Sequence, residues 1–252
     1  FIMISIYPIT TGFIKTGDDP VKRIVDSIEV DIEEGDVLVV SSKPLLIAYG
    51  KVVDLSFIKY GSNALELSEK YSIDPKFAEL ILKYSEGIYG GVKEAILTMV
   101  DGVLLANAGL DKKNAGINKI ALPFTELKGA AEKFYKYIYN KYGVRVGVII
   151  SDSMVAPLRR GTRAVAVYTY GFKPVKDYRG KPDLYGRRIR FTQFNLADAI
   201  VSAAHLVMGE GSESIPAALV KGVDVELIDG DTSEYAKIPK DLCIYSKLYD
   251  PT

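Results

Sequence analysis

Cysteine and histidine are nearly missing from this chain of 252 residues, which has one of each and no tryptophan. The single cysteine, Cys243, excludes an internal disulfide and a cysteine-based zinc site, and it suits a reducing compartment. The single histidine, His205, excludes metal sites built from several histidines. Any bound metal would therefore be held by carboxylate, hydroxyl and carbonyl oxygens, which suit Mg²⁺ or Mn²⁺.

Long apolar runs are also missing. No stretch is long enough to span a membrane, and the first residues lack the basic-then-apolar order of a signal peptide. We therefore expect a cytoplasmic protein without a membrane partner. The composition is that of an ordinary globular protein, with 48% hydrophobic and 25% charged residues, and a chain of this length can bury a full core.

Charge is unevenly distributed, although the net charge is zero. The segment from Arg159 to Arg190 holds ten basic residues, opposed only by Asp177 and Asp183. Such a segment in a neutral chain indicates a local anionic partner rather than general affinity for nucleic acid. A solvated Arg/Lys face is the alternative, and for this run taken alone it is the better interpretation.

Hydrophobic periodicity and turn residues predict strands and helices along the whole chain. Strands are expected at 4–7, 37–40, 96–100, 103–106, 146–150, 164–168 and 217–220, and helices at 19–28, from 63, from 74 to 87, at 126–142 and from 195. Asp101-Gly102 is a strong signal for a two-residue hairpin turn. This mixture predicts a mixed α/β (α+β) fold rather than a simple doubly wound sheet.

Three of the expected strands end in polar clusters. The clusters are Ser41-Ser42-Lys43, Asn107-Ala108-Gly109-Leu110-Asp111 and Ser151-Asp152-Ser153. Strand ends are where α/β proteins place ligand sites, because the scaffold holds short polar side chains rigidly beside a crevice.

Asp111 and Asp152 are the best metal candidates in these clusters. Two carboxylates with nearby hydroxyl or amide oxygens, such as those of Ser153 and Asn114, match the needs of a hard cation. The competing interpretation is that each aspartate only caps its own turn. The spacing favours that interpretation for either aspartate taken alone. For the two together it supports a metal site and turn caps equally.

The segment Met208-Gly209-Glu210-Gly211 could let backbone amides approach a phosphate or a base. It follows a helix instead of preceding one, and no Walker or dinucleotide-binding glycine motif is present. Gly209 taken alone is more often a helix C-cap. We interpret His205 as a packed or solvent-edge histidine rather than a catalytic one, and Cys243 as structural.

Taken in order, these strings resemble the F-420 gamma-glutamyl ligase family, the GTP-dependent enzymes that add L-glutamate to a deazaflavin coenzyme. The resemblance spans about Ile4 to Val223, and its most specific strings are the Asn107–Asp111 cluster and Asp183-Leu184-Tyr185-Gly186-Arg187. The other matching stretches are Lys15–Asp19, Val39–Ser42, Gly147–Ser153, Arg159–Gly161, Arg179–Pro182, Ala197–Asp198 and Leu206–Glu210.

The resemblance implies one family unit over residues 1–252, with two intimately packed subdomains, mixed sheets and no fused flavin domain. It implies a homodimer that acts on small molecules and binds no nucleic acid. In the implied reaction GTP phosphorylates a carboxylate of the coenzyme precursor, and the amine of L-glutamate then displaces phosphate. The implied cofactors are Mg²⁺ or Mn²⁺, with K⁺ as a further candidate.

Site residues can be carried over from the family position by position. Asp111 and Asp152 would hold one metal ion, and Ser153 with Glu210 a second. Asp152 and Arg159 are the expected catalytic residues, with Arg159 facing phosphate. The residues expected to bind the nucleotide are Ile9, Thr10, Thr11, Gly12, Ser42, Lys43, Asn114, Met208, Gly209, Glu210 and Gly211.

The chain departs from the family pattern mainly on the phosphate side. Ile47 stands where many relatives carry a lysine, Val155-Ala156 where they carry Gly-Arg, and Ala199 where they carry a glutamate. Lys43 is the nearest replacement for the lost lysine. Each missing charge-assisted contact is worth roughly 1.5–3 kcal/mol.

These departures leave two alternatives to the ligase open. One is a paralogue that joins another amino acid to another acceptor, and the other is a homologue that binds a nucleotide or cofactor without turnover. RNA binding through the segment from Arg159 to Arg190 is the least favoured interpretation, because the chain carries no net positive charge.

Overall fold

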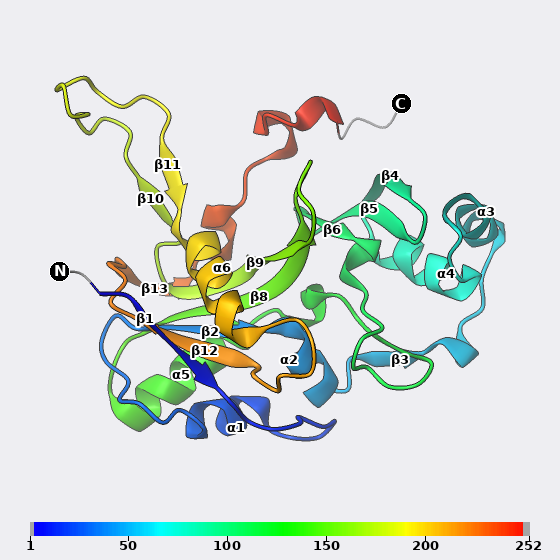
Figure 1. Cartoon of the computed structure of the whole chain (residues 1–252), viewed down its shortest axis with the longest axis horizontal. Coiled ribbons are helices and arrows are strands. Elements are labelled where there is room, and N and C mark those ends of the chain that lie inside the picture. Colours follow the sequence, from blue (N-terminus) through cyan, green and yellow to red (C-terminus); the bar gives the residue numbers. More distant parts are fainter. Residues whose placement is uncertain (1–2, 249–252) are drawn as a thin grey trace.

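A six-stranded mixed sheet forms the centre of the computed structural model, which describes residues 3–248 (Figure 1). In spatial order its strands are β1 (Ser5–Ile9), β12 (Ala217–Lys221), β2 (Val37–Ser41), β8 (Gly147–Val155), β9 (Thr162–Phe172) and β13 (Leu227–Asp231). In this sheet β2 and β8 run parallel, and the other four neighbouring pairs are antiparallel. The expected mixed α/β fold is confirmed.

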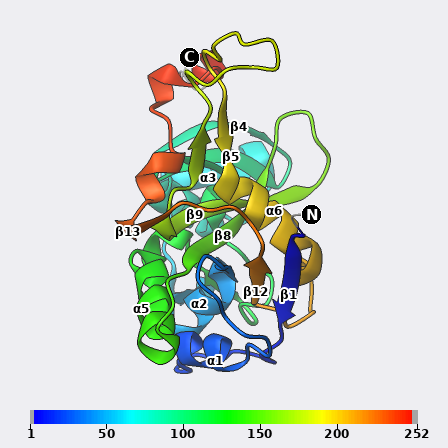
Figure 2. The ribbon, with the colours of Figure 1, turned by 90° about the vertical axis from the view of Figure 1, so that its left-hand side faces the viewer.

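Helices cover both faces of this sheet (Figure 2). Leu38 and Val40 of β2 join the core on one face, and Val37 and Val39 join the core on the other. The helices α1 (Pro20–Asp26) and α5 (Ala130–Tyr142) cover the first face, and α6 (Leu196–Met208) covers the second. A strand buried on both faces is apolar at every position, which explains the continuous apolar run that β2 shows in the sequence.

Helix α5 begins later than the sequence predicts. The segment Phe124–Leu127 forms a separate 3-10 turn, η3, and Gly129 follows it with φ +80°. A residue in the left-handed region interrupts a right-handed helix, so the expected helix from Glu126 starts at Ala130 instead. The helix from Asp74, for which Gly87 was the expected stop, ends at Tyr84, the last residue of its apolar stripe, and Gly87 begins strand β4.

A smaller part of the chain, between residues 52 and 121, lies beside the central sheet (Figure 1). Its elements are β3 (Val52–Asp54), η1 (Leu55–Phe57), α3 (Ser62–Tyr71), α4 (Pro75–Tyr84), β4 (Gly87–Val92), β5 (Ala95–Val100), β6 (Val103–Ala106), η2 (Asn107–Gly109) and β7 (Lys119–Ala121). Asp101 and Gly102, with φ +48° and +72°, form the expected turn between β5 and β6. The division into two subdomains stays a prediction.

An arm projects from the sheet between β9 and α6 (Figure 1). Strands β10 (Val175–Asp177) and β11 (Gln193–Asn195) pair at its base. Leu184, Tyr185 and Phe191 are exposed at its tip. Several of the ten basic residues between Arg159 and Arg190 lie here, and some have acidic partners, such as Arg179 with Asp177 at 2.6 Å.

The C-terminal segment consists of the 3-10 turns η4 (Ser233–Ala236), η5 (Lys240–Leu242) and η6 (Ser246–Leu248). Lys237 ties it to the β5–β6 turn, because its Nζ lies 2.8 Å from a carboxylate oxygen of Asp101. Within residues 3–248, no helix combines the length and the apolar character needed to cross a membrane.

Candidate functional site

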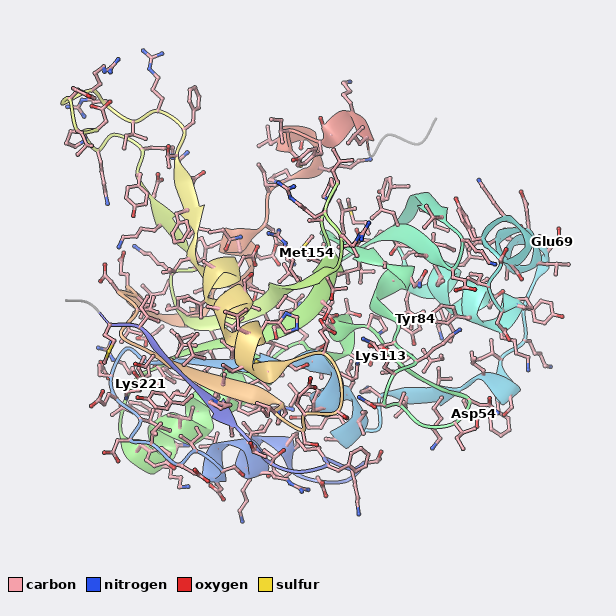
Figure 3. All side chains as sticks on the ribbon, viewed as in Figure 1. Asp54, Glu69, Tyr84, Lys113, Met154 and Lys221 are labelled. Carbon is pink, nitrogen blue, oxygen red and sulfur yellow. The ribbon has the colours of Figure 1, made fainter. Side chains whose placement is uncertain are left out.

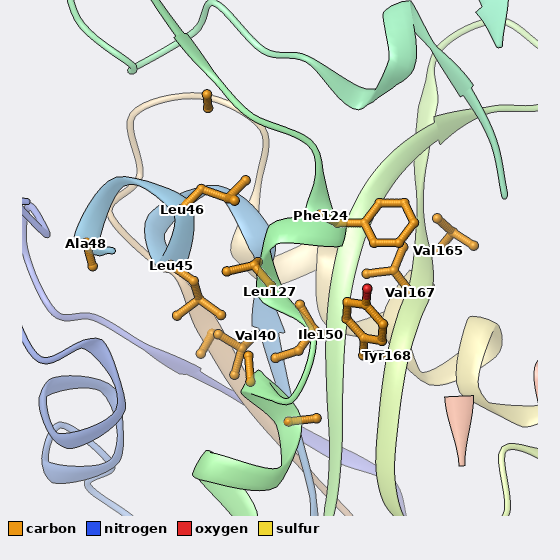
Figure 4. Packing of buried hydrophobic residues seen from close by; sticks show 14 of the residues in the cluster. Val40, Leu45, Leu46, Ala48, Phe124, Leu127, Ile150, Val165, Val167 and Tyr168 are labelled. Carbon is orange, nitrogen blue, oxygen red and sulfur yellow. The ribbon is translucent and has the colours of Figure 1, made fainter. Parts of the chain in front are cut away.

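Two of the three polar clusters lie side by side because β2 and β8 are parallel neighbours. Ser41 is opposite Ser151 in their register, so Lys43, just after β2, and Asp152, still within β8, lie at the same edge of the parallel pair. Helix α2 (Ser42–Ala48) carries Lys43, and its buried Leu45 packs with Val40 into the core beneath the site (Figure 4). The scaffold therefore brings together residues that are more than a hundred positions apart in the sequence.

The third cluster reaches the same edge through an unusual turn. Asn107, Ala108 and Gly109 are three consecutive residues with positive φ, at +53°, +56° and +69°. The left-handed region costs a non-glycine residue roughly 1–2 kcal/mol, and two hydrogen bonds hold the turn there. Asn107 Oδ1 accepts from the Ile96 amide at 2.9 Å, and Thr98 Oγ1 accepts from the Ala108 amide at 2.8 Å.

Lys43 pairs with Asp111, and its charge also acts on the nearby Asp152. Lys43 Nζ forms an ion pair with Oδ2 of Asp111, and both side chains are largely buried. Asp152 Oδ1 accepts a hydrogen bond from the Ser153 amide at 2.8 Å. Burial raises the pKa of Asp152 to about 7 despite that hydrogen bond, and the charge of Asp111 adds to the increase. The ionised pair thus carries more negative charge than Lys43 balances.

A third carboxylate, Glu210, reaches the site from the loop after α6. Gly209 ends that helix with φ +73° and ψ −175°, a region that is essentially restricted to glycine. The turn brings Glu210 back beside His205, whose Nε2 lies 3.0 Å from Glu210 Oε1. The same oxygen accepts from Ser153 Oγ at 2.8 Å and from Thr162 Oγ1 at 3.2 Å.

The loop after Asp111 closes the site from the side of the smaller part of the chain. Lys113, labelled in Figure 3, lies on this loop, and its Nζ is 3.5 Å from Oε2 of Glu210. Asn114 Nδ2 donates to the carbonyl of Gly211 at 3.1 Å. Burial raises the pKa of Glu210, but the hydrogen bond from Ser153 and the nearby charges of His205 and Lys113 outweigh it, so the net shift is downward.

These groups line one pocket of about 240 Å³. Its polar lining includes Ser42, Lys43, Asp111, Asp152, Ser153, His205 and Glu210, and its apolar lining includes Phe13, Ile14, Pro44, Ile47, Ile215 and Pro216. Phe13 is 61% exposed, although it is a large apolar side chain. The arrangement offers a charged region for an anionic group with its cations, next to an apolar surface for a ring system.

Most residues expected at the site line this pocket. Besides the polar residues above, they are Gly12, Asn114, Met208, Gly209 and Gly211. Ile9 instead lies in the core at 2% exposure, opposite Ala217. Thr10 and Thr11 are outside the lining too, although Thr11 connects to the loop after α6 through the Ser214 carbonyl at 3.4 Å.

Arg159 also lies outside the pocket, exposed in the turn between β8 and β9, so its role toward phosphate stays a prediction. None of the ten basic residues between Arg159 and Arg190 lines the pocket. Among the lysine and arginine side chains of residues 3–248, Lys43 is the one that lines the pocket.

His205 is the residue whose position the sequence interpretation did not anticipate. Its side chain is 18% exposed and points to Glu210, five residues later. Helical periodicity cannot show this contact, because it depends on the reversal at Gly209. The available signal is Gly209 after the helix, a residue that the sequence analysis treats as a helix cap or a nucleotide-binding position and not as the point where the chain reverses.

The donor set fits a hard divalent cation. The two candidate metal sites offer only oxygen atoms, from carboxylates and a hydroxyl group. Mg²⁺ and Mn²⁺ prefer such oxygen ligands. Across residues 3–248, no group of three or more His, Cys, Asp or Glu side chains is placed to hold a metal ion. Asp111 and Asp152, or Ser153 and Glu210, would therefore hold an ion that completes its coordination with water or phosphate oxygens.

Comparison with known proteins assigns the chain to a family. The family model described as F420-0:Gamma-glutamyl ligase matches residues 8–222. The coenzyme F420:L-glutamate ligase of Methanopyrus kandleri is 35% identical over 215 residues, covering 85% of this chain and 84% of the relative. The protein of that name from Archaeoglobus fulgidus is 34% identical over 223 residues, covering 88% and 89%.

A third coenzyme F420:L-glutamate ligase, from Methanocaldococcus jannaschii, is 36% identical over 200 residues, covering 79% of this chain and 80% of the relative. The family model spans most of the chain, and each of the three relatives matches more than three quarters of it. The chain therefore belongs to the F420-0:gamma-glutamyl ligase family.

Proposed function

We propose that this protein is a ligase that joins L-glutamate to F420-0 through a gamma-glutamyl amide bond, with GTP as the energy source. The observation that carries the proposal is the meeting of Asp111, Asp152 and Glu210 with Lys43 in one pocket. The names of the relatives support the acceptor and the amino acid. The use of GTP rests on the family resemblance.

The proposed reaction has two steps, because a carboxylate is a poor electrophile. The γ-phosphoryl group of GTP first moves to a carboxylate oxygen of F420-0, giving an acyl phosphate and GDP. The amine nitrogen of L-glutamate then bonds to the acyl carbon, the carbon–oxygen bond to phosphate breaks, and the amine loses a proton. Bound Mg²⁺ or Mn²⁺ would neutralise charge on the phosphates.

The residues of the pocket divide this work. Asp111 and Asp152 would hold one ion and Ser153 with Glu210 the other, while Lys43 supplies a fixed positive charge toward phosphate. Ile47 offers no charge where many relatives have a lysine, so Lys43 carries that role alone on α2. The pocket volume of about 240 Å³ suits the phosphates, so the base or the acceptor ring would extend past Phe13.

Coupled turnover is the first prediction. With Mn²⁺ or Mg²⁺ present, phosphate should be released from GTP only when both F420-0 and L-glutamate are supplied. Mass spectrometry should show a product heavier by one glutamyl residue. Phosphate release that depends on another acceptor or amino acid would instead support the paralogous ligase. Nucleotide binding without any turnover would support the non-catalytic homologue.

Metal-dependent nucleotide binding is the second prediction. Calorimetry should show GDP or GTP binding that requires Mn²⁺, and Asp152→Asn should weaken it roughly tenfold or more because a ligand charge is lost. Folding should not suffer, because the charged form of Asp152 is disfavoured by its burial. The matched control is Asp224→Asn, which removes an exposed carboxylate paired with Lys176. Equal binding by Asp152→Asn and the wild type would reject the assigned site.

Lys43 provides the third prediction. Lys43→Met should weaken GTP binding roughly 10- to 100-fold, as expected for one lost charge-assisted contact. Mn²⁺ binding without nucleotide should not weaken, because Asp111 loses its competing cation. Lys51→Met is the control, since Lys51 pairs with Glu126 outside the pocket. Unchanged GTP affinity in Lys43→Met would show that another cation faces the phosphates.

A homodimer is the fourth prediction, and it rests on the family resemblance. Leu184, Tyr185 and Phe191 of the arm are exposed apolar side chains that a partner copy would cover. Sedimentation velocity should give one species with twice the mass of a single chain. A monomer at micromolar concentration would contradict the prediction.

A further inference from the structure

The two oxygens of Glu210 have very different surroundings. Oε1 lies within 3.2 Å of three donors, which are Ser153 Oγ, His205 Nε2 and Thr162 Oγ1. Oε2 lies 3.5 Å from Lys113 Nζ, a separation longer than that of a good hydrogen bond. A carboxylate oxygen has about two lone-pair directions. The protein therefore saturates Oε1, whereas among residues 3–248 Oε2 has only the long contact with exposed Lys113 and keeps lone pairs for a ligand in the pocket that Glu210 lines.

His205 differs from the other two donors in how firmly it is held. Ser153 and Thr162 are exposed residues near the ends of β8 and β9, whereas the His205 side chain is only 18% exposed. Its backbone carbonyl accepts the Gly209 amide at 3.0 Å, which fixes the last turn of α6. The imidazole is thus attached to a helix with one buried face, and Glu210 is attached to a loop.

We propose that His205 is a positioning residue, whose Nε2–H holds Oε1 of Glu210 so that Oε2 alone is presented to a divalent cation. Groups that orient metal ligands in this way typically change metal affinity about 10- to 100-fold when they are removed. The inference deepens the proposed function and rests on it, because it assumes that Glu210 is a ligand of the second ion.

The loop after Gly209 explains why such an anchor is needed. Glu210 is exposed, and it lies between two glycines that give its backbone wide conformational freedom. A side chain on such a loop loses rotamer entropy when it binds an ion. A hydrogen bond already made in the absence of the ion removes part of that cost in advance.

The first test measures Mn²⁺ binding by electron paramagnetic resonance, in the full chain and without nucleotide. Glu210→Gln identifies the Mn²⁺ sites that depend on Glu210. His205→Leu should weaken these same sites about 10- to 100-fold, and His205→Gln, which keeps an amide donor, should recover much of the loss. Leu206→Gln is the control, because Leu206 is the neighbouring residue of α6 and is 85% exposed.

The second test needs no metal and uses the fact that the chain has a single histidine. In the ¹⁵N spectrum of histidine-labelled protein, His205 should show a protonated Nε2, and its signal should move in Glu210→Gln. If the signal does not move, the hydrogen bond is absent in solution and the inference is overturned, whatever the enzyme does.

The outcomes separate the inference from the proposed function. If the wild type binds no Mn²⁺, the metal part of the proposed function fails, and with it the positioning role. If the wild type binds Mn²⁺ and His205→Leu binds it equally well, only the inference fails. A lower melting temperature with unchanged Mn²⁺ affinity would likewise reduce His205 to a structural contact at the end of α6.

Discussion

The parallel pairing of β2 with β8 is the interaction on which the rest of the site depends. Hydrogen bonds between these strands set Ser41 opposite Ser151, so Lys43 after β2 and Asp152 in β8 lie at one edge of the parallel pair. The antiparallel neighbours on either side and the helices on both faces bury the paired residues Val37–Val40 and Gly147–Ile150. A slip of one residue would turn Asp152 toward the opposite face.

Around this edge the protein gathers negative charge that its own cations do not balance. Lys43 pairs with Asp111, while Asp152 stays beside them with a raised pKa. Glu210 arrives from the loop after α6, and Lys113 and Asn114 arrive from the smaller part of the chain. An excess of carboxylates gathered in one partly buried pocket is unfavourable for folding alone, so it indicates that the pocket is built for a cationic or cation-bound ligand.

Much of the fold could be predicted from the sequence. The continuous apolar run of β2, the Asn195 cap of α6 and the Asp101-Gly102 turn are local patterns, and the structure contains each of them. The predicted start of α5 was wrong, because Gly129 takes a positive φ between η3 and α5, and the spacing of apolar residues does not show this break. The segment from Arg159 to Arg190 was interpreted by its charge, but its place outside the pocket depends on the path of the arm.

The sequence by itself determined which residue types were available: oxygen ligands instead of thiols or histidine clusters, and three polar strand ends in the order of a known family. The tertiary structure alone decided which of them meet. Lys43 faces Asp111, and His205 faces Glu210, because strand pairing and the reversal at Gly209 bring these side chains together. Such contacts form where the chain folds back on itself. Helical or strand periodicity carries no information about that path.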